Sequence, residues 1–271
     1  MKSYNLPARI LSILCVITIC LSCKQEKSEN LNSSTVYFGG DIITMESDTP
    51  KYAQALVERD GKIEFIGDSK EAMTIAGQGH KMVNLEGKTL LPAFLDGHGH
   101  FFNVGFASMC ADLLPPPDGP GADFSSIVDN LNTYKESEEG LYLTEKLGWI
   151  MGMGYDDSQL TERDHPKASD LDKVSTEVPI IIVHQSGHLG VVNTKGLELM
   201  QFNASTKDPD GGIIRRDANG EPNGVLEESA LFAVVFPLLG QLDDELSAKA
   251  IKNGQDEYAK KGYLTAQDGR T

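Results

Sequence analysis

The sequence is short of cysteine and of basic residues, and both shortages exclude classes of protein. Four cysteines in 271 residues cannot form a dense disulfide scaffold. Lysine and arginine together number 24 against 40 acidic residues, so the formal net charge is −16. That charge argues against nucleic acid or an anionic lipid surface as a partner. The content of 40% hydrophobic and 24% charged residues is otherwise that of a globular protein, which excludes collagen-like, disordered and coiled-coil chains.

The sequence also lacks an apolar run long enough to span a bilayer comfortably. Residues 10–21 are almost wholly apolar and follow Lys2 and Arg9, but a spanning helix needs about 20 such residues. A short apolar run behind a basic start is typical of a secretory signal peptide, which we assign to residues 1–22.

The residues after this run predict a lipid anchor. Ser22-Cys23 resembles a bacterial lipobox, which implies cleavage before Cys23 and lipidation of its thiol, although Cys20 stands where a branched aliphatic residue is usual. Residues 23–34 would then be the lipidated cysteine and a polar linker. A plain signal peptide and a signal anchor are the alternatives. We expect an exported protein of the bacterial cell envelope that reaches the membrane through its lipid.

Removal of the signal would leave a mature chain with little covalent support. It takes away Lys2, Arg9 and no acidic residue, so the net charge becomes −18. With Cys23 lipidated, only Cys110 remains, so no intramolecular disulfide can form. We expect Cys110 to be a small buried residue, and the fold to depend on its core or on a metal.

Residues 35–90 predict a small β-domain. Short apolar runs alternate there with turns, and Asp60-Gly61 lies between two alternating runs, which is a strong hairpin signal. Residues 91–271 instead alternate strands with helices, which indicates an α/β fold. The expected strands are residues 90–95, 149–154, 178–183 and 263–268, and the apolar runs at 90–95 and 178–183 are expected to be buried. The expected helices are residues 123–138 and 242–261, and residues 211–226 form an expected hairpin.

The strongest chemical signal is His98-Gly99-His100, directly after the apolar run at residues 90–95. In a strand, residues two apart face the same way, so both imidazoles can point into one site and suit zinc or a similar divalent ion. Asp96 has the same parity and would orient a ligand or bind the metal itself. A solvated loop is the alternative for a bare His-x-His pair.

Several motifs together resemble the amidohydrolase superfamily, in the family 3 branch related to N-substituted formamide deformylase. The first is Leu91-Pro92-Ala93-Phe94-Leu95-Asp96-Gly97-His98-Gly99-His100, which is similar to that superfamily's first barrel strand, with Ala93 in place of the usual glycine. Others follow in matching order, namely Trp149 to Asp156, Gly187-His188, Asp208-Pro209, Gly220 to Glu228, and Gly262 to Asp268.

The resemblance implies a fold and a chemistry. The expected fold is a partial (β/α)8 metallo-hydrolase barrel in residues 91–271, preceded by half of a β-sandwich in residues 35–90. The implied function is metal-dependent hydrolysis of carbon–nitrogen bonds other than peptide bonds, acting on a small amide-like substrate. One or two divalent ions, expected to be zinc, would activate water, with His98 and His100 as the first two ligands.

Three further residues complete the expected site. Asp96, His188 and Glu228 are the candidate catalytic residues. His188 has the alternative role of capping a strand, and Glu228 that of an exposed neighbour on a hairpin. His165 is expected to face solvent in a loop.

The chain resembles only the N-terminal part of such an enzyme. A full barrel takes about 250 residues, whereas 173 residues follow His98 and no histidine follows His188. In the family, a lysine, two later histidines and a late aspartate complete the metal site, so we expect this polypeptide alone to have little or no activity. The alternatives are a non-catalytic lipoprotein fragment that binds metal or a partner, and a fragment that never folds.

Overall fold

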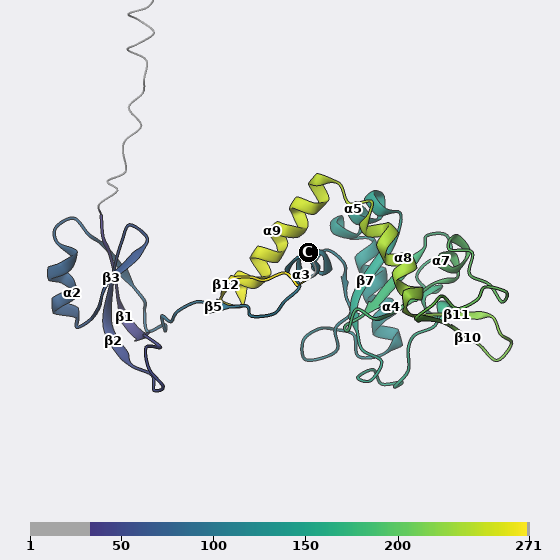
Figure 1. The fold of residues 1–271 in the computed structure, drawn as a ribbon, viewed down its shortest axis with the longest axis horizontal. Coiled ribbons are helices and arrows are strands. Elements are labelled where there is room, and N and C mark those ends of the chain that lie inside the picture. Colours follow the sequence, from purple (N-terminus) through teal and green to yellow (C-terminus); the bar gives the residue numbers. More distant parts are fainter. Residues whose placement is uncertain (1–32, 270–271) are drawn as a thin grey trace, which may run out of the picture. The chain divides into compact units, whose positions relative to one another are not determined.

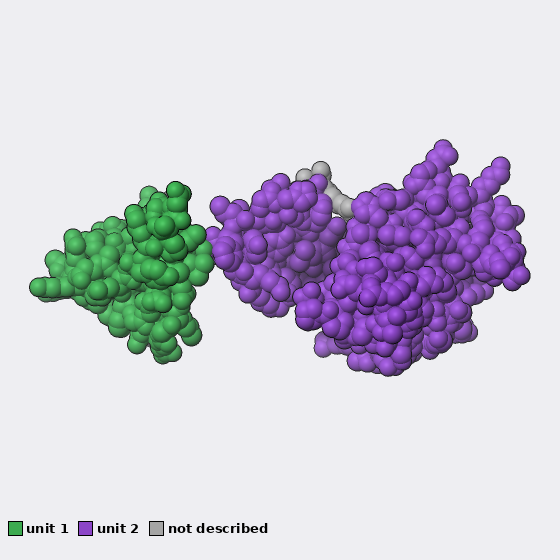
Figure 2. Space-filling view, turned by 90° about the horizontal axis from the view of Figure 1, so that it is seen from below, with its two compact units in different colours: residues 1–92 green, residues 93–271 purple. Residues whose placement is uncertain are grey.

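The computed structural model describes residues 33–269. The expected signal peptide and the lipidated Cys23 lie outside these residues. Within them, none of the helices combines the length and apolar character that a membrane crossing requires. The chain divides into two compact units, residues 1–92 and 93–271 (Figure 2), and each is described by itself.

The first unit is a four-stranded sheet in the order β3-β2-β1-β4 (Figure 1). Its strands are β1 (Thr35–Ile43), β2 (Tyr52–Arg59), β3 (Lys62–Gly67) and β4 (Lys81–Asn84). The pairs β1–β2 and β2–β3 are antiparallel, whereas β4 runs parallel to β1. The hairpin predicted at Asp60-Gly61 joins β2 to β3, with positive φ at both residues, as a tight hairpin turn requires.

The small β-domain predicted for residues 35–90 is a sheet with one helix packed against it. That this sheet is half of a β-sandwich stays a prediction. Helix α2 (Ser69–Ala76) was not expected, and within residues 33–92 the sheet is covered by this helix and by no second sheet. Asp68 begins the helix by accepting hydrogen bonds from two of its backbone amides, and Ala72 and Ala76 pack against Val36 and Val57. The helix is short and its buried residues are alanines, so its apolar signal in the sequence is weak.

The second unit is built on a six-stranded sheet in the order β10-β11-β9-β8-β7-β6. The strands are β6 (Ala111–Asp112), β7 (Ile150–Tyr155), β8 (Ile180–His184), β9 (Leu189–Val192), β10 (Gly212–Arg216) and β11 (Pro222–Glu228). The neighbours β6, β7 and β8 are parallel, because helical crossovers connect them. The other three strands are antiparallel, as the hairpin predicted at residues 211–226 requires.

Strand β8 is buried on both faces, as its continuous β-branched run predicts. Ile180 and Ile182 pack into one core cluster, and Ile181 and Val183 pack into the other. The helices that contribute to these clusters are α3 (Phe101–Ala107), α4 (Phe124–Lys135), α5 (Glu138–Leu147), α6 (Ala168–Leu171), α7 (Thr194–Leu199), α8 (Ser229–Leu239) and α9 (Asp244–Lys260). The single tryptophan, Trp149, is buried in the cluster that contains Ile181 and Val183.

A separate two-stranded sheet carries the start of the second unit. Strand β5 (Phe94–Leu95) pairs in parallel with β12 (Tyr263–Thr265). The predicted strand at residues 90–95 is therefore shorter than expected, and it is not buried, because Phe94 is 48% and Leu95 is 74% exposed. Among the residues described, β12 alone pairs with this strand.

Helix α3 (Phe101–Ala107) follows this strand and packs closely on α9 (Figure 1). A side chain at Gly105 would overlap the backbone carbonyl of Ala250, and one at Gly254 would meet Phe101. These two glycines allow the close approach of the helices.

The strands in residues 33–269 do not close into a barrel. The barrel prediction holds for the alternation of strands and helices through β6, β7 and β8. It fails after β8, where four residues connect to β9, because a connection this short can only return antiparallel.

Candidate functional site

The predicted metal-binding histidines lie on a bend. The strand ends at Leu95, residues 97 and 98 form the bend, and His100 immediately precedes α3. The two histidines are therefore not in a strand, so the alternation of side chains along a strand cannot be the reason that His98 and His100 face the same way. The rings of His98 and His100 are nevertheless neighbours, with centroids 5.6 Å apart and planes at 79°.

Asp268 connects the end of the chain to this bend. It forms an isolated bridge with His100, and its Oδ2 accepts a 3.0 Å hydrogen bond from the backbone amide of Phe102. The amide of Gly269 also donates to the carbonyl of Gly99 at 2.9 Å. The carboxylate therefore caps the first turn of α3 and holds the backbone on which His100 sits.

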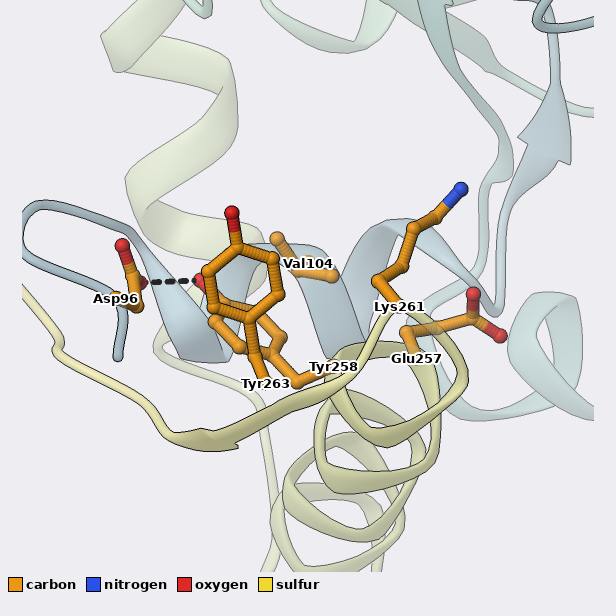
Figure 3. A pocket seen from close by; sticks show the side chains of 6 residues that line it. All are labelled: Asp96, Val104, Glu257, Tyr258, Lys261 and Tyr263. Carbon is orange, nitrogen blue, oxygen red and sulfur yellow. Dashed lines mark hydrogen bonds between the residues drawn. The ribbon is translucent and has the colours of Figure 1, made fainter. Parts of the chain in front are cut away.

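Asp96 is tied to the same bend by both of its oxygens. Oδ1 accepts from the backbone amide of His98 at 3.2 Å, and Oδ2 accepts from the Tyr258 hydroxyl at 2.9 Å (Figure 3). Burial, the hydrogen bond to Asp96 and the nearby carboxylates raise the pKa of Tyr258, so its hydroxyl keeps the donated proton. A side chain at Gly99 would overlap the Asp96 carboxylate and the Tyr258 hydroxyl. Glycine at this position therefore allows α9, which carries Tyr258, to approach the bend closely.

A pocket of about 340 Å³ opens beside this hydrogen bond. Its lining residues come from the bend, α3, the C-terminal end of α9 and β12, and they are Asp96, Val104, Glu257, Tyr258, Lys261 and Tyr263 (Figure 3). The lining is mostly apolar, with carboxylates and an amine at its edge, which suits a small organic molecule.

One feature of His100 suits a metal ligand. Its Nδ1 is buried and has no hydrogen-bond partner, a state that costs free energy unless a ligand occupies the nitrogen. His98 is exposed beside it. Two neighbouring imidazoles are suited to a divalent ion, although these residues supply only part of a complete coordination shell.

His188 and Glu228 form a second group. Nδ1 of His188 lies 2.9 Å from Oε2 of Glu228, and both side chains are about half exposed. The backbone amide of Glu228 also donates to the carbonyl of His188 at 2.8 Å. The two predicted catalytic residues, 40 positions apart, thus hold one another at the point where β11 passes into α8.

The backbone of Glu228 is strained. Its φ is 49° and its ψ is −119°, a combination that favours glycine. Glutamate at such a position indicates that its side chain has a use there, because strain of this kind concentrates at functional sites.

A third group was missed in the sequence. Ligand atoms of Asp156, Asp157 and His184 all lie within 4.8 Å of one another. The first two follow β7 and the third ends β8, which are parallel neighbours. The signal was present, since polar residues follow each buried strand directly, and carboxyl ends of parallel strands meet at one edge of a sheet.

Asp156 is the most constrained member of this group. Its oxygens accept hydrogen bonds from the backbone and hydroxyl of Ser158 and from the amides of Gln159 and Gln185. Burial acts to raise the pKa of Asp156, but these hydrogen bonds and the nearby His184 outweigh it and lower the pKa to about 2. The carboxylate is therefore ionised and fixed in direction.

His165 corrects a prediction. It was expected to face solvent, but it is only 4% exposed, and its Nδ1 lies 3.0 Å from the Tyr155 hydroxyl. Burial, opposed by Asp157, lowers the pKa of His165. The polar composition around this residue suggested a solvated loop, but the contact with Tyr155 is made across ten residues and is not visible in that local pattern. The prediction for Cys110 is confirmed, since it is buried and burial raises the pKa of its thiol.

The predicted residues are thus brought together in two groups. Asp96, His98 and His100 form one, and His188 with Glu228 forms the other. Among residues 33–269, no hydrogen bond, ion pair or ring contact joins the two.

Comparison with known sequences identifies relatives. A model of the amidohydrolase family matches residues 81–271. The chain is 29% identical to N-substituted formamide deformylase of Arthrobacter pascens, over 66% of this chain and 31% of that protein. It is 33% identical to exoenzymes regulatory protein AepA of Pectobacterium carotovorum subsp. carotovorum (74% and 42%) and 29% identical to putative amidohydrolase YtcJ of Bacillus subtilis strain 168 (80% and 40%). The chain therefore spans less than half the length of these relatives.

Comparison with solved structures also finds metal-dependent hydrolases. An uncharacterized metal-dependent hydrolase from Pyrococcus horikoshii OT3 matches with a TM-score of 0.56 and 25% identity, over 86% of this chain and 42% of that one. A metal-dependent hydrolase from Pyrococcus furiosus matches with the same TM-score and 22% identity, over 86% and 43%, which shows a shared fold. The chain therefore belongs to amidohydrolase family 3 and is related to N-substituted formamide deformylase.

Proposed function

We propose that the protein hydrolyses carbon–nitrogen bonds other than peptide bonds in small amide-like molecules, and that a divalent metal ion, zinc in the first instance, activates the water. His98 and His100 would be the first two ligands of that ion. The buried, unpartnered Nδ1 of His100 beside the ring of His98 is the observation on which this rests. Membership of the amidohydrolase family and the deformylase relative support the bond type.

A zinc ion at this position would lower the pKa of a bound water and polarise a substrate carbonyl. The chain's own residues would hold the two ligands in place. Asp96 accepts a hydrogen bond from the backbone amide of His98, and the Tyr258 hydroxyl donates a hydrogen bond to the other oxygen of that carboxylate. Asp268 caps the helix that begins after His100. Each of these contacts limits the motion of the bend, which favours a preformed site.

His188 and Glu228 would handle a proton or orient substrate. In the tautomer whose Nδ1 donates to Oε2 of Glu228 at 2.9 Å, Nε2 has a free lone pair. That nitrogen can accept a proton or a substrate hydrogen bond. We place this pair in the site of the whole protein as a proposal, on the family resemblance and the strained backbone of Glu228.

The proposal includes the cell envelope as location. Its basis is the signal-like segment and Cys23 in the sequence. Labelling with a radioactive fatty acid in a bacterial host tests it, since Cys23→Ser should abolish incorporation.

The test of the function compares zinc binding and turnover in matched variants. Full chain freed of metal is titrated with zinc against a chromophoric chelator, and formate release from N-substituted formamides is then measured, both on this chain and on the protein isolated from its natural source. His98→Ala together with His100→Ala should remove one equivalent of bound zinc and all turnover. His80→Ala, a histidine of the first unit, is the control and should change neither.

Two results would overturn the proposal. One is unchanged zinc stoichiometry in the double variant. The other is a metal-loaded natural protein that hydrolyses neither formamides nor other N-acyl amines, which would favour a binding role.

A further inference from the structure

We propose that Asp156, Asp157 and His184 bind a divalent transition-metal ion, of the zinc or manganese class, at a site of their own. Their ligand atoms lie within 4.8 Å of one another, and two carboxylates with one imidazole suit such ions better than calcium or magnesium. The proposal is independent of the function proposed above, since no residue of the bend at residues 96–100 takes part.

The imidazole of His184 points into the space between the carboxylates. Its Nε2 is 3.3 Å from Oδ1 of Asp157 and 3.5 Å from Oδ1 of Asp156. The side chain is only 10% exposed, and Nε2 is buried without a hydrogen-bond partner. A buried nitrogen in that state is destabilising unless a ligand occupies it.

Asp157 supplies the second donor atom and the route of entry. Its carboxylate is 33% exposed. In the described part of the chain its Oδ1 lies 3.3 Å from Nε2 of His184 and 3.8 Å from Nε2 of His165, but the carboxylate accepts no hydrogen bond. An ion from solvent can therefore reach Oδ1 of Asp157 without displacing a donor, and this side of the site would hold the water that completes a four-ligand shell.

The supporting contacts are those of a metal site. Asp156 is fixed by the side chains of Ser158, Gln159 and Gln185. On His184, Nδ1 lies 2.9 Å from the Ser186 hydroxyl, which can accept the proton that Nδ1 must carry when Nε2 binds metal. The backbone amide of Ser186 donates to Nδ1 at 3.1 Å, which makes Nδ1 an acceptor in that contact. Metal binding at Nε2 would place the proton on Nδ1, so this bond would be lost and the Ser186 hydroxyl would accept from Nδ1 instead.

A protonated His184 between two carboxylates would satisfy the same charges without an ion. Direct binding separates the two explanations. Full chain carrying His98→Ala and His100→Ala is freed of metal and titrated with cobalt(II), whose visible absorption reports coordination. We expect one equivalent to bind. Addition of Asp157→Asn should weaken binding by about tenfold or more, and addition of His184→Gln should do the same, as expected for loss of a metal contact.

Two variants outside the proposed site are the controls. Asp164→Asn removes another aspartate of the loop after β7, and His80→Ala removes a histidine of the first unit. Both should leave cobalt affinity unchanged. Fluorescence of the buried Trp149 shows whether each variant is folded, and if His184→Gln is not, the partly exposed Asp157→Asn decides alone.

The proposal is wrong if the chain carrying the two alanines binds no cobalt, or if Asp157→Asn and His184→Gln bind it as tightly as their parent. Since the titration contains no substrate, it is unaffected by failure of the hydrolase proposal. Conversely, loss of turnover in His98→Ala with cobalt still bound here would support both sites separately.

Discussion

Glu228 offers a direct test of the claim that its backbone is strained. At an ordinary exposed position, replacement of a side chain by glycine leaves a protein less stable than replacement by alanine, by about 0.5–1 kcal/mol. At φ 49° and ψ −119° the order should reverse. Strain of about 1–3 kcal/mol remains in the alanine variant and disappears in the glycine variant.

The net expectation is that Glu228→Gly is more stable than Glu228→Ala by about 1 kcal/mol, once the entropy cost of glycine is subtracted. Both variants lose the contact with His188, so that half-exposed pair cancels in the comparison. For a unit of this size, the difference corresponds to about 2–4 °C in melting temperature.

The assay is urea unfolding followed by Trp149, the only tryptophan, which is buried in the same unit. Lys252 on α9 is the matched control, because it is exposed and paired with Asp256. There the glycine variant should be less stable than the alanine variant by about 1 kcal/mol. If Glu228→Ala equals or exceeds Glu228→Gly in stability, the strain argument and the functional interpretation built on it are both lost.

Three further predictions follow from single contacts. Gly99→Ala should weaken zinc binding by about tenfold or more, because the added methyl group would displace Asp96 and Tyr258. Gly97→Ala is the control, because a side chain there would meet nothing within 4 Å. Equal zinc titration curves for the two variants would refute this. Asp123→Ala should cost about 1 kcal/mol of unfolding free energy at neutral pH. Because the backbone hydrogen bond from Ser126 lowers the pKa of Asp123, that contribution is present above pH 4 and should vanish as pH falls further, so a constant difference between pH 6 and 3 would contradict it. Cys110 should resist iodoacetamide until urea unfolds the chain, as peptide mass mapping can show, because burial raises its pKa; rapid labelling in buffer would count against that burial.

The sequence pattern predicted helices and strands of the second unit well, but it predicted less well which of them are buried. The β-branched run at residues 178–183 identifies β8, and the helix expected at residues 242–261 corresponds to α9, which Asp243 caps. In contrast, the apolar run before Asp96 was expected to be buried, and Leu95 is exposed. Burial depends on what packs over a segment, and that is not a property of the segment.

The candidate sites divide in the same way. His98 and His100 could be identified in the sequence because they lie only two residues apart. His188 and Glu228 could be identified because a family resemblance includes them. Asp156, Asp157 and His184 are separated by the whole crossover between two strands, so only the pairing of β7 with β8 brings them together. A search limited to short spacings does not detect such a group.

The same reasoning identifies what holds the predicted histidines in place. Asp96 meets Tyr258 across 162 residues, and the amide of Phe102 meets Asp268 across 166. Both partners come from α9 and the segment after it, so the geometry of the bend depends on the packing of α3 against that helix. The contact in turn depends on glycine at position 105, where a side chain would overlap the backbone of Ala250, and at position 254, where a side chain would crowd Phe101. Residues with no metal-binding chemistry therefore limit where the histidines lie, and a substitution at either glycine should disturb zinc binding without touching a ligand.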